Sequence, residues 1–128
     1  MFPITALYAA LCALLVLALA INVVRLRLGE GVSLGDGGNE KVNRAVRAHG
    51  NAVEYLPLIL ILIALLEGNN ANNWALYLYG TVLFLSRLAH AWGLLAMPTT
   101  TNNFRKLGII GTWLVLLTAS AHLIVIYL

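Results

Sequence analysis

Long apolar stretches separated by short polar segments dominate the pattern along this chain. An α-helix needs about 20 mostly apolar residues to cross the hydrocarbon core of a bilayer, and the chain contains four such stretches. With their polar ends included, they predict spanning helices at about residues 3–27, 42–67, 73–96 and 104–128. The pattern therefore predicts an all-α fold, an integral membrane four-helix bundle, with residues 1–128 as a single domain.

Composition favours lipid as the solvent of this bundle. Apolar residues make up 61% of the chain and charged residues only 10%, against roughly 25% charged in an average soluble domain. The single cysteine, Cys12, excludes a disulfide framework within the chain. No CxxC or Cys/His cluster suggests a metal, so none is expected. The first stretch lacks a basic leading region and a cleavage site, so we expect it to be retained as a span.

The net charge of +3 takes its meaning from where the cations lie. All Lys and Arg residues flank the first and third loops, except Arg87, which lies within the third stretch. The positive-inside rule then predicts that these two loops are cytoplasmic and that both termini are on the non-cytoplasmic side. Cations beside spans are not a nucleic-acid surface, so no nucleic-acid partner is expected. We predict a multi-pass integral membrane protein, in the inner membrane if the source is bacterial.

The second stretch begins with residues that are costly in lipid. Arg44, Arg47, Asn51 and Glu54 are spaced 3, 4 and 3 apart, which places them on one face of an α-helix. Such residues usually pair, face a bundle interior or line a functional cavity. Two interpretations stay open: an ion-pair network that holds helices together, or a site for a small zwitterion. Pro57, soon after, is expected to kink this helix or to leave the Val53 carbonyl without its helical hydrogen bond.

Further polar residues lie toward the same side of the membrane. Arg87 and His90 share a face of the third helix, as a second wall of a polar cavity or as partners of Glu54. Arg105 lies in the first turn of the fourth helix, where its charge and the helix N-terminus would favour a thiolate or carboxylate; alternatively it is an interfacial anchor. One small bundle has little room for so many polar groups, so we expect an oligomer that shares them between subunits.

The stretch RAHGNAVEYLP resembles a motif of the membrane-associated proteins in eicosanoid and glutathione metabolism, the MAPEG family. The family pattern is an arginine, an asparagine four residues on, a glutamate seven on and a proline soon after; here these are Arg47, Asn51, Glu54 and Pro57. VRLRL at the end of the first helix, SRLAHAWGLLAMP in the third and NFR at the start of the fourth are also similar to family segments.

The resemblance implies a homotrimer that binds glutathione between adjacent protomers and takes a lipophilic small-molecule substrate from the membrane lipid. Arg105 would be the catalytic residue, stabilising the thiolate. Carried over by position, the residues lining the glutathione site would be Arg25, Arg47, Asn51, Glu54, Tyr55, Arg87 and His90.

Three functions follow as hypotheses. The first is a glutathione-dependent membrane transferase or peroxidase, of the microsomal glutathione transferase type, acting on a lipophilic electrophile or a lipid hydroperoxide. The second is a non-catalytic lipid-binding membrane scaffold of the same fold. The third is a small four-span multidrug transporter. Those transporters depend on a glutamate in the first span, and here no acidic residue precedes Glu30, which counts against the third.

Overall fold

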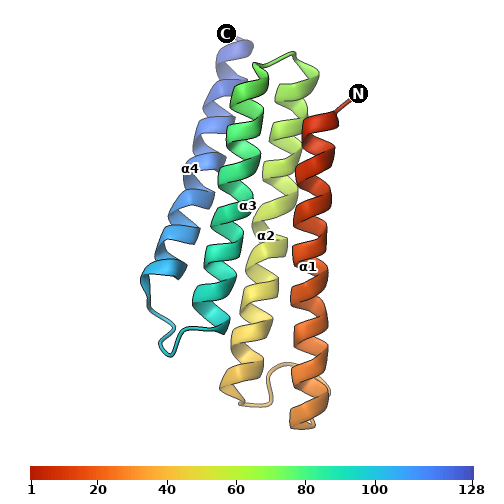
Figure 1. The fold of residues 1–128 in the computed structure, drawn as a ribbon, viewed down its shortest axis with the longest axis vertical. Coiled ribbons are helices and arrows are strands. Elements are labelled where there is room, and N and C mark those ends of the chain that lie inside the picture. Colours follow the sequence, from red (N-terminus) through yellow and green to blue (C-terminus); the bar gives the residue numbers. More distant parts are fainter.

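A computed structural model describes residues 1–128 and contains four helices and no strand (Figure 1). The helices are α1 (Pro3–Glu30), α2 (Glu40–Gly68), α3 (Asn73–Leu95) and α4 (Asn103–Ile126). Each helix ends within three residues of the predicted boundary; the largest difference is the extension of α1 to Glu30 instead of residue 27. The predicted all-α four-helix bundle is confirmed. The expected kink at Pro57 does not interrupt α2, which is one continuous helix.

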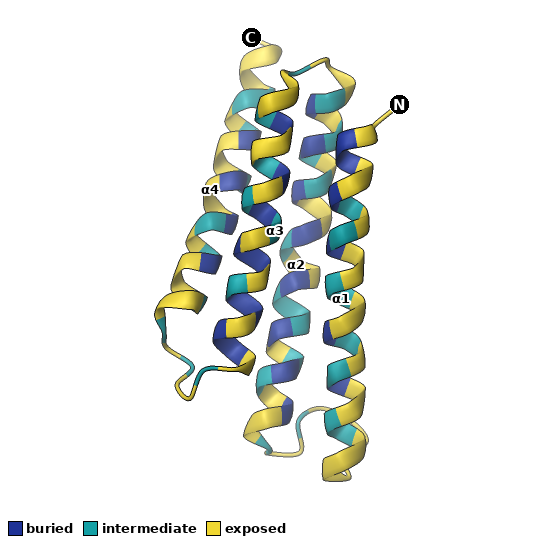
Figure 2. Ribbon diagram, in the orientation of Figure 1, coloured by how far each residue is buried: buried dark blue, intermediate teal, exposed yellow.

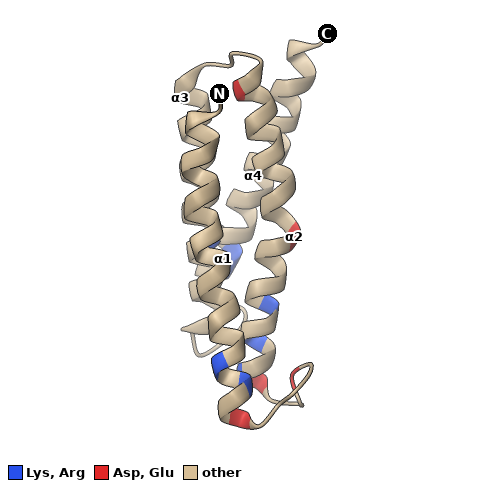
Figure 3. Cartoon of the chain, turned by 90° about the vertical axis from the view of Figure 1, so that its right-hand side faces the viewer, with Lys and Arg blue, Asp and Glu red and all other residues tan.

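The helices run up and down, so both termini lie at one end of the bundle (Figure 1). α2 and α3 each contact all three other helices, whereas α1 and α4 do not touch each other. We call the end with the termini the terminal end. The opposite end, which holds the connections 31–39 and 96–102, is called the basic end because Lys and Arg gather toward it (Figure 3). That the basic end faces the cytoplasm stays a prediction from the charge pattern.

Three of the helices, α1, α2 and α4, are long and apolar enough to cross a membrane on their own. α3 is long enough but is not among them, and it contains Arg87 and His90. Both side chains are buried, with 1% and 3% of their surfaces exposed. Since α3 packs against every other helix and hides these groups from lipid, it can cross the membrane together with its neighbours.

The outer surface of the bundle is largely apolar. Only 27 of the 128 residues are buried, and large aliphatic side chains are exposed along all four helices (Figure 2). A water-soluble protein would expose far fewer, because large exposed apolar surfaces associate. The small core and apolar exterior are those of a protein surrounded by lipid or by copies of itself.

The first turns of the four helices are capped by two kinds of polar side chain. α2, α3 and α4 each begin after an asparagine whose side chain accepts a backbone N–H of the first turn: Asn39, Asn72 and Asn102. α1 has no such cap. The Glu67 carboxylate takes that role from α2, accepting the N–H groups of Ile4 and Thr5 at 2.9 and 2.8 Å and the Thr5 hydroxyl at 2.6 Å. This carboxylate fixes the terminal end.

Candidate functional site

The predicted polar face of α2 divides into two rows. Arg44 and Asn51, seven residues apart, are partly buried and turn toward the rest of the protomer. Arg47 and Glu54, also seven apart, are exposed and make no hydrogen bond or ion pair within the chain. We call these the inner row and the outer row. The sequence spacing placed all four residues on one face of α2. In the structure, the edge of the surface that α2 packs against the other helices runs between the inner row and the outer row.

The inner row meets Arg87, which lies almost fully buried between α2, α3 and α4. Its Nη2 donates to Asn51 Oδ1 at 2.7 Å and approaches His90 Nδ1 at 3.2 Å. Its Nη1 lies 3.4 Å from the hydroxyl of Thr112, and the Tyr55 ring centroid lies 6.0 Å from its guanidinium carbon. Arg87 therefore joins three helices through neutral partners. We call Asn51, Arg87, His90 and Thr112 the inner cluster.

The contact with Arg87 decides the protonation of His90. A guanidinium has only donors, so the facing Nδ1 of His90 must be an acceptor. His90 is therefore neutral and carries its proton on Nε2. It can offer a hydrogen-bond donor to a ligand from Nε2, but it cannot act as a base there.

One of the two alternatives for Arg87, a pairing with Glu54, is not found within the protomer. The ion pair of this structure is the local one between Arg44 Nε and Glu40 Oε1, at 3.1 Å. Glu54 belongs to the outer row and is exposed. Burial of an arginine without a carboxylate is costly. The neutral acceptors around Arg87 offset part of this cost, while the Nε atom of Arg87 has no hydrogen-bond partner.

Glycines on α3 and α4 allow the inner cluster to close. A Cβ on Gly108 would lie 2.5 Å from the backbone nitrogen of His90 and 2.6 Å from the carbonyl oxygen of Ser86. The two backbones can approach this closely only without that atom. Thr112, one turn after Gly108, is thereby brought to Arg87. Sequence reasoning did not find Thr112; the only signal was a hydroxyl in an apolar stretch.

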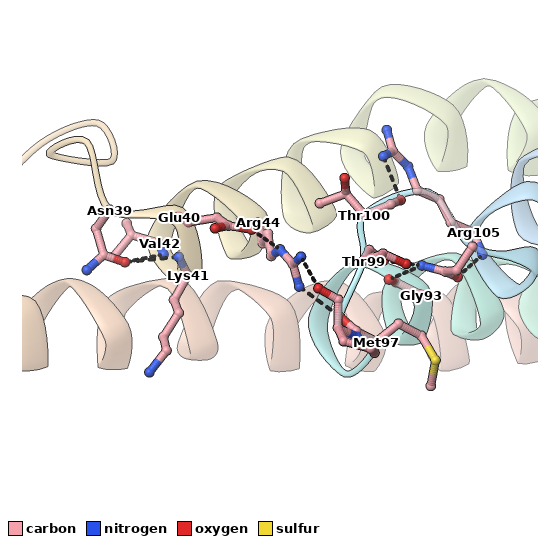
Figure 4. Close-up of polar contacts among 12 residues, drawn as sticks. Asn39, Glu40, Lys41, Val42, Arg44, Gly93, Met97, Thr99, Thr100 and Arg105 are labelled. Carbon is pink, nitrogen blue, oxygen red and sulfur yellow. Dashed lines mark hydrogen bonds and ion pairs between the residues drawn. The ribbon is translucent and has the colours of Figure 1, made fainter.

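Arg105 lies away from the inner cluster, at the start of α4. It is partly buried, its backbone N–H is capped by Asn102 at 3.0 Å, and its Nη1 donates to the carbonyl of Thr100 at 3.0 Å (Figure 4). Its position in the first helical turn is as expected. Its guanidinium is held by the preceding loop and makes no hydrogen bond to Arg87 or to the outer row.

Arg25 occupies a separate hollow between α1 and α2 at the basic end. It donates to Asn22 at 3.0 Å. With Lys41 and Arg44 it lines a hollow of about 380 Å³, which is within the usual size range of small-molecule sites.

Asp36 orders the first loop, between α1 and α2. Its carboxylate accepts the backbone N–H of Gly38 at 2.9 Å and the side-chain amide of Asn43 at 2.5 Å. These bonds favour the charged form, so they lower the pKa of Asp36 below its ordinary value, the Gly38 bond having the larger effect.

The structure thus brings together Asn51, Tyr55, Arg87 and His90 from the predicted set. Tyr55 is oriented by the indole N–H of Trp113, which donates to its hydroxyl at 3.0 Å. The other predicted residues do not join this group: Arg25, Arg47 and Glu54 are exposed, and Arg105 is partly buried in the first turn of α4. No group of three or more His, Cys, Asp or Glu side chains lies together where it could hold a metal ion.

Comparison with known proteins agrees with this architecture. The model of the MAPEG family matches residues 5–125. The inner membrane protein YecN of Escherichia coli, from strains K12 and CFT073, is 40% identical over 114 residues, which cover 89% of this chain and 85% of YecN. The location of this relative and the apolar helices identify the chain as an integral inner membrane protein. It belongs to the MAPEG family.

Proposed function

We propose that this protein is a glutathione-dependent transferase or peroxidase that acts on a lipophilic electrophile or a lipid hydroperoxide. We further propose that it works as a homotrimer with glutathione bound between protomers. The observation that carries the proposal is the outer row. Arg47 and Glu54 have opposite charges, lie on a membrane-spanning helix and have no partner within the chain.

Unpaired charges on the outer side of a membrane-spanning helix need a physical explanation. Glu54 lies 13 residues before Glu67, which at 1.5 Å per residue is about 20 Å from the terminal end of α2. A carboxylate at that depth facing lipid costs on the order of 3 kcal/mol. The same outward side of α2 exposes Val53, Leu58 and Ile61. A second protomer packed on this side would shield the outer row and leave polar space beside it.

The residues present fit a charged tripeptide. Arg47 can bind a carboxylate through two parallel hydrogen bonds, and Glu54 can accept an ammonium group. Asn51 uses its Oδ1 for Arg87 and has its amide N–H groups free. Arg87, His90 and Tyr55 support this wall from inside, and Arg25 can contribute a cation from the end of α1.

Bound glutathione would supply a thiolate able to attack a lipophilic electrophile or to reduce a lipid hydroperoxide. The chain's contribution is to favour the ionised thiol. Arg105 carries a full positive charge, and the first turn of α4 adds the partial charge of its unpaired N–H groups. Both act in the same direction on a nearby thiol.

Calorimetric titration of the detergent-purified protein with glutathione tests the proposal, with Arg47→Ala as the control. We expect saturable binding to the wild type and a loss of affinity of about thirtyfold or more in the variant, as when one partner of a hydrogen-bonded charge pair is removed. Equal binding by both proteins would contradict the role of Arg47. No binding at millimolar glutathione would contradict the proposed function.

The second candidate is a non-catalytic lipid-binding scaffold. One observation favours it: Arg87 and Arg105 already have hydrogen-bond partners within the chain, as groups with a structural role would. Absence of glutathione binding, with the oligomer intact in Arg47→Ala, would support the scaffold.

A further inference from the structure

The connection between α3 and α4 is held by side chains to an unusual degree. In residues 96–102, here called loop three, five consecutive backbone carbonyls each accept a hydrogen bond from a side chain. The acceptors are Met97 and Pro98 (from Arg44), Thr99 (from Asn102), Thr100 (from Arg105) and Thr101 (from Thr99). The backbone of loop three is therefore defined by a few specific side chains.

Arg44 is the one side chain among these that comes from another part of the chain. Its Nη1 donates to Met97 O at 2.8 Å and its Nη2 to Pro98 O at 3.0 Å, across more than 50 residues of sequence. Its Nε lies 3.1 Å from Glu40, as an ion pair without the alignment of a hydrogen bond. Figure 4 shows the guanidinium between α2 and loop three. A planar fork that holds two consecutive carbonyls fixes both the position and the orientation of the loop.

Loop three in turn determines where Arg105 lies. The Arg105 guanidinium donates to Thr100, two residues after Pro98. Asn102 ties the same segment to the end of α3 by donating to Gly93 O at 2.7 Å. A Cβ on Gly93 would lie 2.5 Å from the Arg105 backbone nitrogen, so this junction has no free space. A movement of loop three at Met97 and Pro98 would therefore displace the Arg105 side chain.

We propose that Arg44 is a positioning residue that holds Arg105 in place for thiolate stabilisation. This inference rests on the proposed function. Arg44 would not touch glutathione through these groups, because both of its Nη atoms donate to loop three and its Nε faces Glu40. It acts on the thiol only through the loop.

Lys41 provides the matched control. It is a cation one turn before Arg44 on the same helix, it is exposed, and its side chain makes no hydrogen bond to loop three. In Figure 4 it points away from loop three. Lys41→Gln and Arg44→Gln remove the same charge from the same end of the bundle, and they differ in the contact with the loop and in the ion pair with Glu40. Arg44→Lys keeps the charge but loses the two-pronged contact.

The test is the ultraviolet absorbance of the thiolate, titrated against pH at saturating glutathione, together with the calorimetric Kd. For Arg44→Gln we expect the ionisation constant of the bound thiol to fall about tenfold, equivalent to a rise of one pKa unit, with a much smaller change in Kd. In the pKa of the bound thiol, Arg44→Lys should lie between Arg44→Gln and wild type, and Lys41→Gln should match wild type. Hydrogen exchange of loop-three amides without glutathione should accelerate only in the Arg44 variants.

The possible failures are distinguishable. A wild type that binds glutathione without forming thiolate, or does not bind it, overturns the proposed function and this inference with it. Normal thiolate formation in Arg44→Gln overturns the positioning role alone, whatever the exchange rates. If Arg44→Gln does not fold, Arg44→Lys is the deciding variant. Faster hydrogen exchange in loop three with an unchanged thiolate fraction overturns the positioning role of Arg44. A reduced thiolate fraction supports that role.

Discussion

The two rows of α2 carry polar residues at similar depth in opposite surroundings. In the inner row, Asn51 accepts from the buried Arg87 and Arg44 holds loop three. In the outer row, Arg47 and Glu54 have no partner in the chain. The difference separates two kinds of role on this helix: its polar groups that already have partners define the fold, and those that have none are available for a ligand or another subunit. Three comparisons test this division, and a last prediction concerns the first loop.

The largest expected effect comes from the same substitution, glycine to alanine, made once at a packed helix contact and once on the open side of α2. Gly108→Ala would place a Cβ 2.5 Å from the His90 backbone nitrogen, so it should lower the free energy of unfolding by about 3 kcal/mol by forcing α3 and α4 apart. Gly50→Ala, on the open side of α2, has no atom within 4 Å of the new Cβ and should raise it by about 0.5 kcal/mol. Thermal unfolding in detergent measures both. Destabilisation by Gly50→Ala would show that another subunit packs closely there.

The second comparison removes one polar group from each row. Asn51→Leu leaves a buried arginine donor without its acceptor and should lower the free energy of unfolding by about 2 kcal/mol. Arg47→Ala should change it by less than about 0.5 kcal/mol, because an exposed side chain without partners contributes little. Both are measured in the absence of glutathione. Equal losses would make the outer row part of the subunit contact instead of a binding site.

The third comparison uses two carboxylates of the same helix. Glu67 accepts three hydrogen bonds from the first turn of α1, and Glu67→Gln replaces one of its two acceptor oxygens with a donor. We expect a loss of about 1 kcal/mol and faster hydrogen exchange at the start of α1. Glu54→Gln should leave that exchange unchanged and instead weaken glutathione binding. Faster exchange in Glu54→Gln would argue that both carboxylates are structural.

The smallest effect concerns Asp36 in the first loop. Its pKa is lowered in the folded state by the hydrogen bonds from Gly38 and Asn43. The stabilisation is therefore complete above the unfolded pKa of about 3.9 and is lost as the pH falls through the lowered folded value. Nuclear magnetic resonance should show that the Gly38 amide loses its protection from hydrogen exchange only at pH values below about 3.9. Asp36→Asn keeps an acceptor oxygen for this amide and should remove the pH dependence; if the dependence persists, another group causes it.

The structure brings together half of the residues in the predicted site. Asn51, Tyr55, Arg87 and His90 do come together, because the spacing on each helix and the shared depth in the membrane are both readable from the sequence. Thr112 was missed because a threonine in an apolar span usually bonds its own helix, as Thr112 also does to Gly108 O at 2.8 Å. The link from Arg44 to loop three was missed because its acceptors are backbone carbonyls, which no residue type reveals.

The sequence by itself determined the number of helices, their ends within three residues and the gathering of cations at one end. These follow from apolar length and from local composition. Only the tertiary structure decided which polar residues face inward. Positions three or four apart on a helix differ by about 60° or 40° around its axis. Four polar residues on one face can therefore lie on both sides of the edge of a helix contact. Where that edge falls depends on the neighbouring helices, and here Asn51 faces Arg87 of α3 while Arg47 and Glu54 stay outside.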